Sequence, residues 1–337
     1  MQPAHRTQKG PRSAGQNGLT MVELLVAMAI SLVIGIAAIA SLIVSRQGFT
    51  AIDASSQLRE NGRFAMDLLQ RIGVQSGYQD VLYIATPRQT NVVGVGANPD
   101  PNIFGIDNKI PSSSNPFDTA PTTTGINGSD ILIIRYQTGE TFPGSLVSDK
   151  AMIDCQGNAP SGVPINQDDR MSSVFYVKTS NGEPSLMCST GPGTEQPIIE
   201  GVETFQVLYG VDAVTANTAP VIGTTDSIAD RYLRADQMTV SGNAVATNDN
   251  WRRVRTLRIG MVLRGPVGSA QDSAAQTFYP LGLAKNSSSS SSTVGSAMSS
   301  TSDVGTIFSP TADRRLRQVV TFTVHLRNEQ GLKLQTP

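Results

Sequence analysis

Hydrophobic positions divide the chain into an apolar amino-terminal segment, an amphipathic continuation and a longer region of short alternating runs. Residues 24–45 carry no charge and consist mainly of Leu, Ile, Val and Ala. A helix of this length, at about 1.5 Å per residue, spans the hydrocarbon core of a bilayer, which is about 30 Å thick. The pattern therefore predicts a transmembrane helix over about residues 24–45, surrounded by the lipid bilayer.

The helix is predicted to continue beyond Arg46 as an amphipathic segment. Residues 45–77 contain no proline, and apolar residues recur at helical spacing at Leu58, Ala65, Leu69 and Ile72. The charged residues between them fall mostly on other faces, so the apolar stripe is expected to pack on a sheet. Gly73 and Gly77 are the expected stop signals, which gives one long helix over residues 19–78.

After residue 78 the pattern predicts strands and loops. Residues 86–129 are rich in Gly, Pro, Ser, Thr and Asn, so long surface loops with one or two short strands are expected there. The strand candidates are residues 130–136, 173–177, 185–188, 202–209, 254–263 and 319–327. A helix followed by strands predicts an α+β fold, in which the long helix packs on an antiparallel β-sheet head over residues 79–337.

Two local patterns add detail to this head. Asn181-Gly182 is a turn dipeptide and predicts a hairpin between the second and third strand candidates. Residues 287–292 are an unbroken serine tract. Such a composition buries too little apolar surface to offset the entropy of ordering, so residues 286–303 are expected to be a disordered loop.

A single carboxylate stands at the start of the apolar segment. The first 18 residues are hydrophilic and contain three basic and no acidic side chains, and Gly18-Leu19-Thr20-Met21-Val22-Glu23 then leads into the apolar run. Thr20 and Glu23 fit a capping box, which stabilises the start of a helix. The capping box leaves the glycine and the basic leader unexplained. A carboxylate in a membrane costs about 2.5–3.5 kcal/mol on insertion scales, so a cationic partner is expected.

This segment resembles the processing site of a type IV prepilin. The resemblance implies that residues 1–18 are a cytoplasmic leader peptide, that a prepilin peptidase cuts after Gly18, and that Leu19 becomes the methylated new amino terminus. It also implies an assembly role for Glu23 and Thr20, because in this family the glutamate meets the methylated amino terminus of a neighbouring subunit. Leu19 departs from the family's commonest residue at that position, which is Phe.

A cleaved secretory signal is the competing interpretation of the amino terminus. Its apolar region is normally about 7–15 residues long and ends at a small-residue cleavage site. Here the apolar run is longer, and the polar break precedes it. Basic residues before the run predict a cytoplasmic amino terminus, and therefore a single-pass inner-membrane protein with a periplasmic head.

Charge argues against nucleic acid as a partner. Loss of the leader removes three of the 26 basic side chains, which leaves 23 against 27 acidic side chains and a net charge of −4. Such a balance lacks the basic face that nucleic-acid binding requires. Two arginine clusters, residues 252–255 and 314–317, precede strand candidates and are expected to be solvated strand edges or contacts with other subunits.

The two cysteines, Cys155 and Cys188, suggest a disulfide in the exported head. An oxidising compartment and an even cysteine count favour pairing. The bridge would close a loop of about 34 residues, worth roughly 4 kcal/mol in the chain-entropy model. Two separate buried thiols are the alternative. Neither cysteine belongs to a C-x-x-C pair, so neither zinc binding nor redox catalysis is indicated.

Neither a cofactor nor a metal site is predicted. The histidines are His5, in the leader, and His325, in a strand candidate, and no hydrolase or nucleotide-binding motif occurs. Asp168-Asp169 and Asn248-Asp249-Asn250 lack the spacing of a calcium loop and are expected to be solvated loops. A membrane-anchored periplasmic enzyme is the alternative from another functional class, but no convergent set of nucleophile, base and oxyanion donor is visible.

Later segments resemble the PilW-type minor pilins of type IV pilus systems. These segments are residues 130–136, the hairpin from Phe175 to Cys188, residues 200–210, and residues 313–317 together with 326–328. The resemblance implies a structural role in priming pilus assembly at the inner membrane, with incorporation at the pilus tip. The implied partners are the prepilin peptidase, other minor pilins, the major pilin and the assembly platform. A minor pseudopilin of a type II secretion system is the alternative, because it shares the processing motif.

Overall fold

The computed structural model describes residues 18, 20–80, 98–166, 168–221, 223, 225–270, 272–282, 303–328 and 330. The expected leader up to residue 17, Leu19 and all but the last residue of the expected serine-rich loop lie outside these residues. The chain divides into two units, residues 1–50 and 51–337. Each unit is described by itself below.

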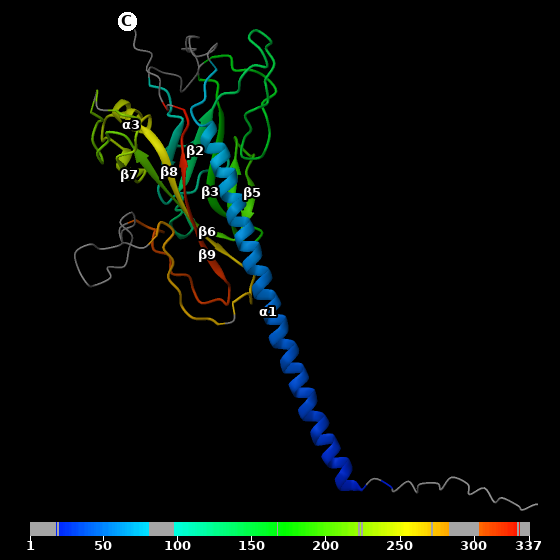
Figure 1. Ribbon diagram of the computed structural model, residues 1–337. Helices are drawn as coiled ribbons and strands as arrows, with labels where there is room; N and C mark the ends of the chain where they lie inside the picture. Colours follow the sequence, from blue (N-terminus) through cyan, green and yellow to red (C-terminus); the bar gives the residue numbers. More distant parts are fainter. Residues whose placement is uncertain are drawn as a thin grey trace, which may run out of the picture. The chain divides into compact units, whose positions relative to one another are not determined.

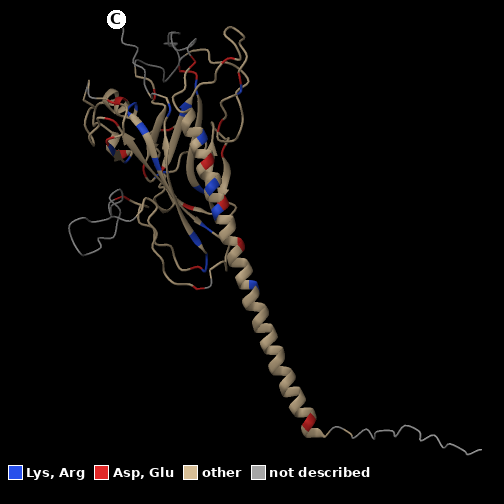
Figure 2. Ribbon diagram, viewed as in Figure 1, with Lys and Arg blue, Asp and Glu red and all other residues tan. Residues whose placement is uncertain are grey.

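Helix α1 (Met21–Gln75) contributes its first part to the amino-terminal unit and its last part to the second unit. Figure 2 shows no charged residue on the helix between Glu23 and Arg46. In the second unit the predicted apolar stripe of Leu58, Ala65, Leu69 and Ile72 is buried. The helix ends where Gly77 adopts a φ of 71°, a left-handed conformation that suits glycine.

Five antiparallel strands form the first sheet of the second unit (Figure 1). Strand order follows chain order: β1 (Ile103–Ile106), β2 (Ile131–Tyr136), β3 (Met171–Ser180), β4 (Glu183–Ser189) and β5 (Gln196–Glu200). The predicted hairpin joins β3 and β4, and Asn181 and Gly182 both have positive φ, at 51° and 83°. Two central residues with positive φ match a type I′ turn, whose twist suits a two-residue hairpin.

Four antiparallel strands form the second sheet, in the order β7-β6-β8-β9. They are β6 (Val202–Val211), β7 (Arg231–Leu233), β8 (Val254–Arg264) and β9 (Arg317–His325). The 3₁₀ turns η1 (Ile126–Gly128) and η2 (Asp236–Met238) and the helix α3 (Ala244–Trp251) complete the described elements. Gly201, between β5 and β6, takes the chain from one sheet to the other with a φ of 80°. A Cβ there would lie 2.5 Å from the Arg264 carbonyl oxygen, so the crossing requires glycine.

One hydrophobic core unites the second part of α1 with both sheets. Residues of α1, such as Leu69 and Ile72, share a cluster with residues of the five-stranded and four-stranded sheets. The helix approaches β9 most closely at two glycines. A Cβ on Gly62 would lie 2.8 Å from Val320 Cγ2, and one on Gly73 would lie 2.6 Å from Val324 Cγ1. The sequence pattern predicts a stop signal at Gly73, but α1 continues to Gln75. Gly73 instead allows the helix to pack closely against β9.

A second, smaller cluster covers the other face of the five-stranded sheet. Ile131, Ile133 and Tyr176 pack there with side chains that include Ile110 and Phe117, which come from the loop between β1 and β2. Strand β2 is therefore buried along its whole length. Burial on both faces explains why its sequence is a continuous apolar run and does not alternate.

The expectation that residues 248–250 form a solvated loop is wrong. Asn248, Asp249 and Asn250 belong to α3 instead of a solvated loop, and Asn250 is fully buried. Its amide donates to the carbonyl oxygens of Thr218 at 2.9 Å and Met238 at 3.0 Å, which explains why an asparagine is accommodated in the interior.

The arginines that were expected to be solvated are mostly engaged within the chain. Arg317 pairs with Glu203 at 2.6 Å and with Asp313 at 2.8 Å, and its side chain is only 6% exposed. Arg315 pairs with Glu183 at 3.0 Å. The charges of this cluster therefore balance one another where the two sheets meet.

Candidate processing and assembly site

Thr20 and Glu23 form a reciprocal capping box at the start of α1. The Thr20 N–H and the Thr20 hydroxyl both donate to Glu23 Oε2 at 2.9 Å, and the Glu23 N–H donates to Thr20 Oγ1 at 3.3 Å. These bonds satisfy backbone donors that the first helical turn leaves without partners. All of the bonds to the carboxylate use Oε2. Within the described residues, Oε1 of Glu23 accepts no hydrogen bond.

Gly18 has no structural requirement in the folded chain. The residue is exposed, its φ lies outside the left-handed region, and a Cβ built on it would meet no described atom within 4 Å. Neither conformation nor packing among the described residues therefore explains a glycine at this position. Leu19, the expected methylated residue, lies outside the described residues.

The apolar part of α1 is long and apolar enough to cross a membrane, and none of its most apolar window is buried within the chain. The Ser31 hydroxyl donates to the Ala27 carbonyl oxygen at 2.7 Å, so the helix satisfies this polar group internally. Ala27, Ser31 and Gly35 are small residues spaced four apart on one face, and no described atom would contact a Cβ on Gly35. Small residues at this spacing allow helices in a membrane to approach closely.

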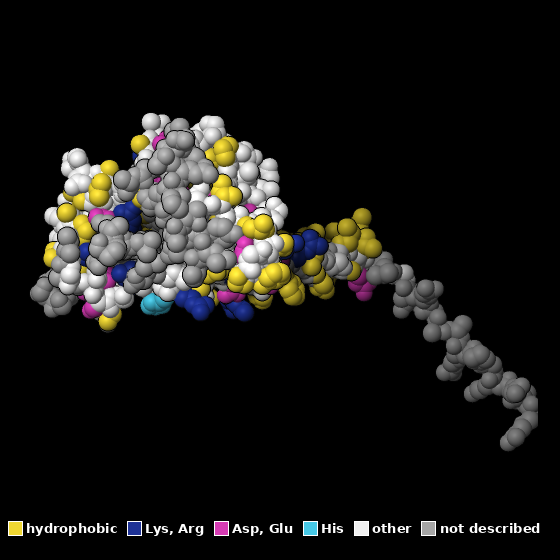
Figure 3. Space-filling model, turned by 90° about the horizontal axis from the view of Figure 1, so that it is seen from above, with side chains coloured by type: hydrophobic (Ala, Val, Ile, Leu, Met, Phe, Trp, Pro, Cys, Tyr) yellow, Lys and Arg dark blue, Asp and Glu magenta, His cyan; other side chains and the backbone are white. Residues whose placement is uncertain are grey.

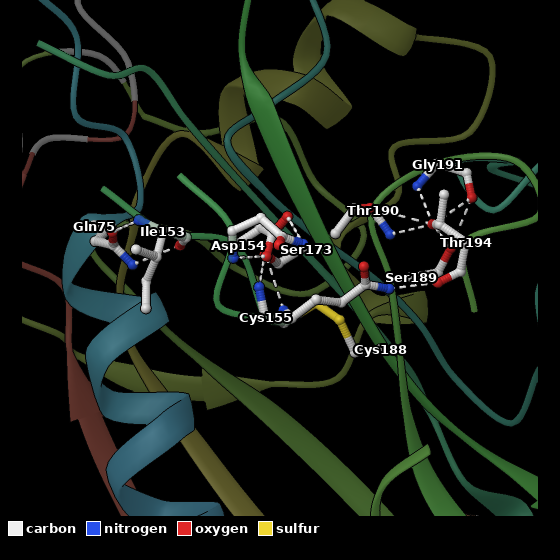
Figure 4. The surroundings of a disulfide bond; sticks show 12 residues. Gln75, Ile153, Asp154, Cys155, Ser173, Cys188, Ser189, Thr190, Gly191 and Thr194 are labelled. Atoms are coloured by element: carbon white, nitrogen blue, oxygen red, sulfur yellow. Dashed lines mark hydrogen bonds between the residues drawn. A yellow bond between two sulfur atoms is a disulfide. The ribbon is translucent and has the colours of Figure 1, made fainter. Parts of the chain in front are cut away.

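The other end of α1 is joined to a loop of the head by one glutamine. Figure 4 shows Gln75, the last residue of the helix, facing Ile153. The Ile153 N–H donates to Gln75 Oε1 at 2.8 Å, and Gln75 Nε2 donates to the Ile153 carbonyl oxygen at 3.2 Å. The same carbonyl oxygen accepts the Tyr136 hydroxyl at 2.6 Å. These contacts hold the loop between β2 and β3 against the end of the helix.

A disulfide fixes the same loop to the five-stranded sheet. Cys155 and Cys188 are bonded, with their Cα atoms 5.9 Å apart, and both are buried in the main core (Figure 4). The Cys155 N–H donates to Ser173 Oγ on β3 at 3.1 Å. Asp154 orders the turn that follows, because its Oδ1 accepts the N–H groups of Gln156 and Asn158, each at 2.9 Å.

The chain beyond β9 caps the carboxyl end of α1. Asn328 Nδ2 donates to the carbonyl oxygens of Val74 at 3.3 Å and Ser76 at 3.0 Å. The Ser76 hydroxyl donates to Gln330 Oε1 at 2.8 Å. The last turn of α1 has no basic residue, so side chains from a distant segment supply the donors that its terminal carbonyls need. No sequence signal marked these contacts of Gln75, Asn328 or Gln330, because each acts on a residue far away along the chain.

The remaining candidate residues do not converge on a chemical site. His325 is exposed at the end of β9, and Asp168 and Asp169 lie in the loop before β3. Among the described residues, no group of three or more His, Cys, Asp or Glu side chains is placed to hold a metal ion.

Comparison with known proteins yields two family matches. The family described as type IV pilus-assembly protein W matches residues 174–328, and the prokaryotic N-terminal methylation motif matches residues 13–39. No curated protein sequence matches the chain. Among solved structures, the type IV-like pilin TTHA1219 from Thermus thermophilus aligns with 81% of this chain and 98% of its own, at 13% identity and a TM-score of 0.35.

The first match covers β4 to β9 and most of β3, and the second covers the capping box with residues 24–39 of the apolar run. Together with the long helix and the antiparallel sheets, these matches support a PilW-type minor pilin of type IV pilus systems.

Proposed function

We propose that the chain is a minor pilin that is processed after Gly18, is methylated on Leu19 and takes part in priming type IV pilus assembly at the inner membrane. Its apolar helix anchors it with the head in the periplasm. Its partners are the prepilin peptidase, other minor pilins, the major pilin and the assembly platform, and it is incorporated at the pilus tip. The prepilin-like motif and the PilW match support this proposal.

The observation that carries the proposal is that only one of the two oxygens of the Glu23 carboxylate accepts hydrogen bonds from the described chain. Oε2 is held by Thr20, whereas Oε1 accepts no hydrogen bond from the described chain. A fixed carboxylate with one free oxygen suits a cation brought by another molecule. A methylated amino terminus of a neighbouring subunit is such a cation, and the pair would lower the cost of burying either charge in lipid.

The small-residue face of the helix supports association in the same membrane. Gly35 lowers helix propensity by about 1 kcal/mol relative to alanine, and no described side chain packs against it. Close packing of a helix from another pilin against Ala27, Ser31 and Gly35 would use this face. A preassembled set of minor pilins held in this way would lower the barrier to starting a filament.

The experiment measures the intact mass of the membrane-extracted chain and the number of surface pili for the wild type and three variants. Wild-type protein should begin at a methylated Leu19, and Gly18→Ala should remain uncut. Glu23→Gln keeps an acceptor oxygen for the capping box but loses the charge, whereas Thr20→Ala loses the cap and keeps the charge. We expect processing in both and a far greater loss of pili with Glu23→Gln.

Two results would contradict the proposal. An uncut wild-type chain, or one cut after the apolar run, would exclude the prepilin pathway. Equal numbers of surface pili in the wild type and the Glu23→Gln variant would show that the Glu23 charge has no role in assembly.

A further inference from the structure

The edge strand β9 differs from the other strand edges of the two sheets. The edge strands β1, β5 and β7 have four, five and three residues, and β5 contains Pro197 and pairs with β4 through a register shift. Strand β9 has nine residues and no proline, and its pairing with β8 runs from Arg264–Arg317 to Thr256–His325 without a bulge. Short edges, prolines and bulges prevent unwanted pairing of edges. Strand β9 has none of these.

The free edge of β9 presents the backbone groups of its odd-numbered residues. The Leu326 N–H donates to the Arg255 carbonyl oxygen at 2.9 Å, so His325 and Thr256 form a non-hydrogen-bonded pair. The alternation of an antiparallel ladder then directs the N–H and C=O groups of Thr321, Thr323 and His325 away from β8. Within the described residues, none of these groups forms a backbone hydrogen bond on that side. Thr321 and His325 are exposed, and Thr323 is partly exposed.

The packing of α1 does not use the odd-numbered residues of β9, of which Thr321 donates its hydroxyl to the Pro280 carbonyl oxygen and Arg317 pairs with Glu203. The helix glycines meet the side chains of Val320 and Val324, which are even-numbered and lie on the opposite face of the strand. A change at an odd-numbered position therefore alters the free edge without touching the contact with α1.

Charge indicates what kind of segment fits this edge. Residues 317–328 contain Arg317, His325 and Arg327 and no acidic side chain. Arg317 is neutralised by Glu203, whereas His325 and Arg327 are exposed and form no salt bridge with a described carboxylate. Figure 3 shows the histidine at the surface beside Lys and Arg side chains. A hollow of about 590 Å³ opens next to them, lined in part by Tyr232 and Arg255.

A second copy of β9 is a poor occupant of this edge. Two antiparallel copies would bring the His325 and Arg327 end of one strand beside the Arg317 end of the other, and neither strand contributes a carboxylate. Arg317 is already paired with Glu203 and Asp313, so a second copy would leave the charge of Arg327 without a partner. An extended segment with an acidic residue beside Arg327 would instead supply the missing negative charge.

We propose that the free edge of β9 binds an extended segment of another minor pilin head, which adds a fifth strand to the β7-β6-β8-β9 sheet and brings a carboxylate to Arg327. Main-chain hydrogen bonds provide affinity in this mode of recognition, and the side chains provide specificity. The partner's identity as a pilin rests on the proposed function.

The test uses the full-length, affinity-tagged chain in cells that produce its own pilus. Thr323→Pro removes an outward N–H at a position where an edge strand tolerates proline, and Thr323→Val keeps the N–H and the shape of the side chain. We expect Thr323→Pro to reduce the recovery of the other minor pilins at least tenfold and Thr323→Val to leave it unchanged. Arg327→Glu should also reduce recovery, because it repels the acidic residue.

A cross-linking measurement keeps the test independent of how well the proline variant folds. A photoreactive side chain placed at Thr321 should cross-link to an extended, acid-bearing segment of one other minor pilin. Cross-linking to a second copy of this chain, or unchanged recovery of minor pilins with both Thr323→Pro and Arg327→Glu, would overturn the inference. Failure of the wild-type chain to be cut after Gly18 would instead contradict the proposed function.

Discussion

The side-chain amide of Gln75 pairs with the backbone of Ile153 as a neighbouring strand would. Its Oε1 accepts the Ile153 N–H at 2.8 Å, and its Nε2 donates to the Ile153 carbonyl oxygen at 3.2 Å. One side chain at the end of α1 thereby holds a loop that lies 78 residues further along the chain. The adjacent disulfide then fixes that loop to β4.

Replacement of Gln75 by alanine should lower the free energy of unfolding of the head by about 1–3 kcal/mol, because the Ile153 N–H loses its acceptor. The Ile153 carbonyl oxygen keeps its bond from Tyr136. The chain has a single tryptophan, Trp251, which lies in the core against Tyr209 and Phe104, so its fluorescence reports unfolding. Gln70→Ala, at an exposed position on the same helix, is the matched control and should change stability little. Equal stability of the two variants would contradict the role of Gln75.

Loss of the disulfide should destabilise the head substantially. Cys155 and Cys188 are separated by 33 positions, and a loop of this length gives a stabilisation of about 4 kcal/mol in the chain-entropy model. We expect Cys155→Ser combined with Cys188→Ser to lower the denaturant midpoint of the Trp251 signal. The wild-type chain with and without reductant serves as the comparison. An unchanged midpoint after verified reduction would show that the bridge contributes nothing to stability.

The two packing glycines of α1 should not tolerate even a methyl group. Gly62→Ala and Gly73→Ala gain about 1 kcal/mol in helix propensity, but each places a Cβ against a valine of β9. Overpacking of this kind costs about 1–3 kcal/mol, so a net loss of head stability is expected. Val320→Ala in the Gly62→Ala background should recover part of that loss.

Gly48→Ala provides the matched control for these substitutions. Gly48 also lies in α1, but a Cβ there would meet no described atom within 4 Å. The unfolding of the head should therefore be unchanged in this variant. A loss of stability as large as that of Gly62→Ala would show that the contact with β9 is not the cause.

Buried carboxylates should make the head less stable as the pH rises from about 5 to about 7. Burial raises the pKa of Asp107 to about 7 and that of Asp303 to about 6, and burial also raises the pKa of Asp130 well above its usual range. An unfolded aspartate has a pKa of about 3.9. Between these values the folded chain binds more protons than the unfolded chain, so the free energy of unfolding falls as protons are lost.

The measurement compares thermal unfolding at pH 5 and pH 7 for the wild type and Asp107→Asn. Asparagine has no carboxyl proton to lose. The free energy of unfolding of the variant should therefore decrease less between pH 5 and pH 7 than that of the wild type. The comparison of slopes matters because the amide also replaces one of the oxygens that accept the Ala235 and Asp236 N–H groups. Asp53→Asn, at an exposed position on α1, should retain the wild-type slope.

The elements that follow strong local patterns could be predicted from the sequence. The helix, the strand candidates and the Asn181-Gly182 turn depend on periodicity or on backbone preferences within a few residues. A short strand was expected within residues 86–129, and β1 lies there. The strands β5 and β7 and the helix α3 were missed because they are too short for such a pattern to develop. Residues 244–251 make only about two helical turns, and the burial of Trp251 and Asn250 fixes the position of α3.

The sequence by itself determined the long apolar helix, the capping box of Thr20 and Glu23, and the order of the main strands, because these depend on neighbours along the chain. Only the tertiary structure decided that the strands form two sheets, that Gly62 and Gly73 receive valines of β9, and that Gln75 holds Ile153. Each of these contacts joins segments far apart in the sequence, and its formation depends on the packing of one common core. Composition and periodicity carry no information about such pairs, so the contacts of Asn328 and Gln330 with the end of α1 became recognisable only in the folded chain.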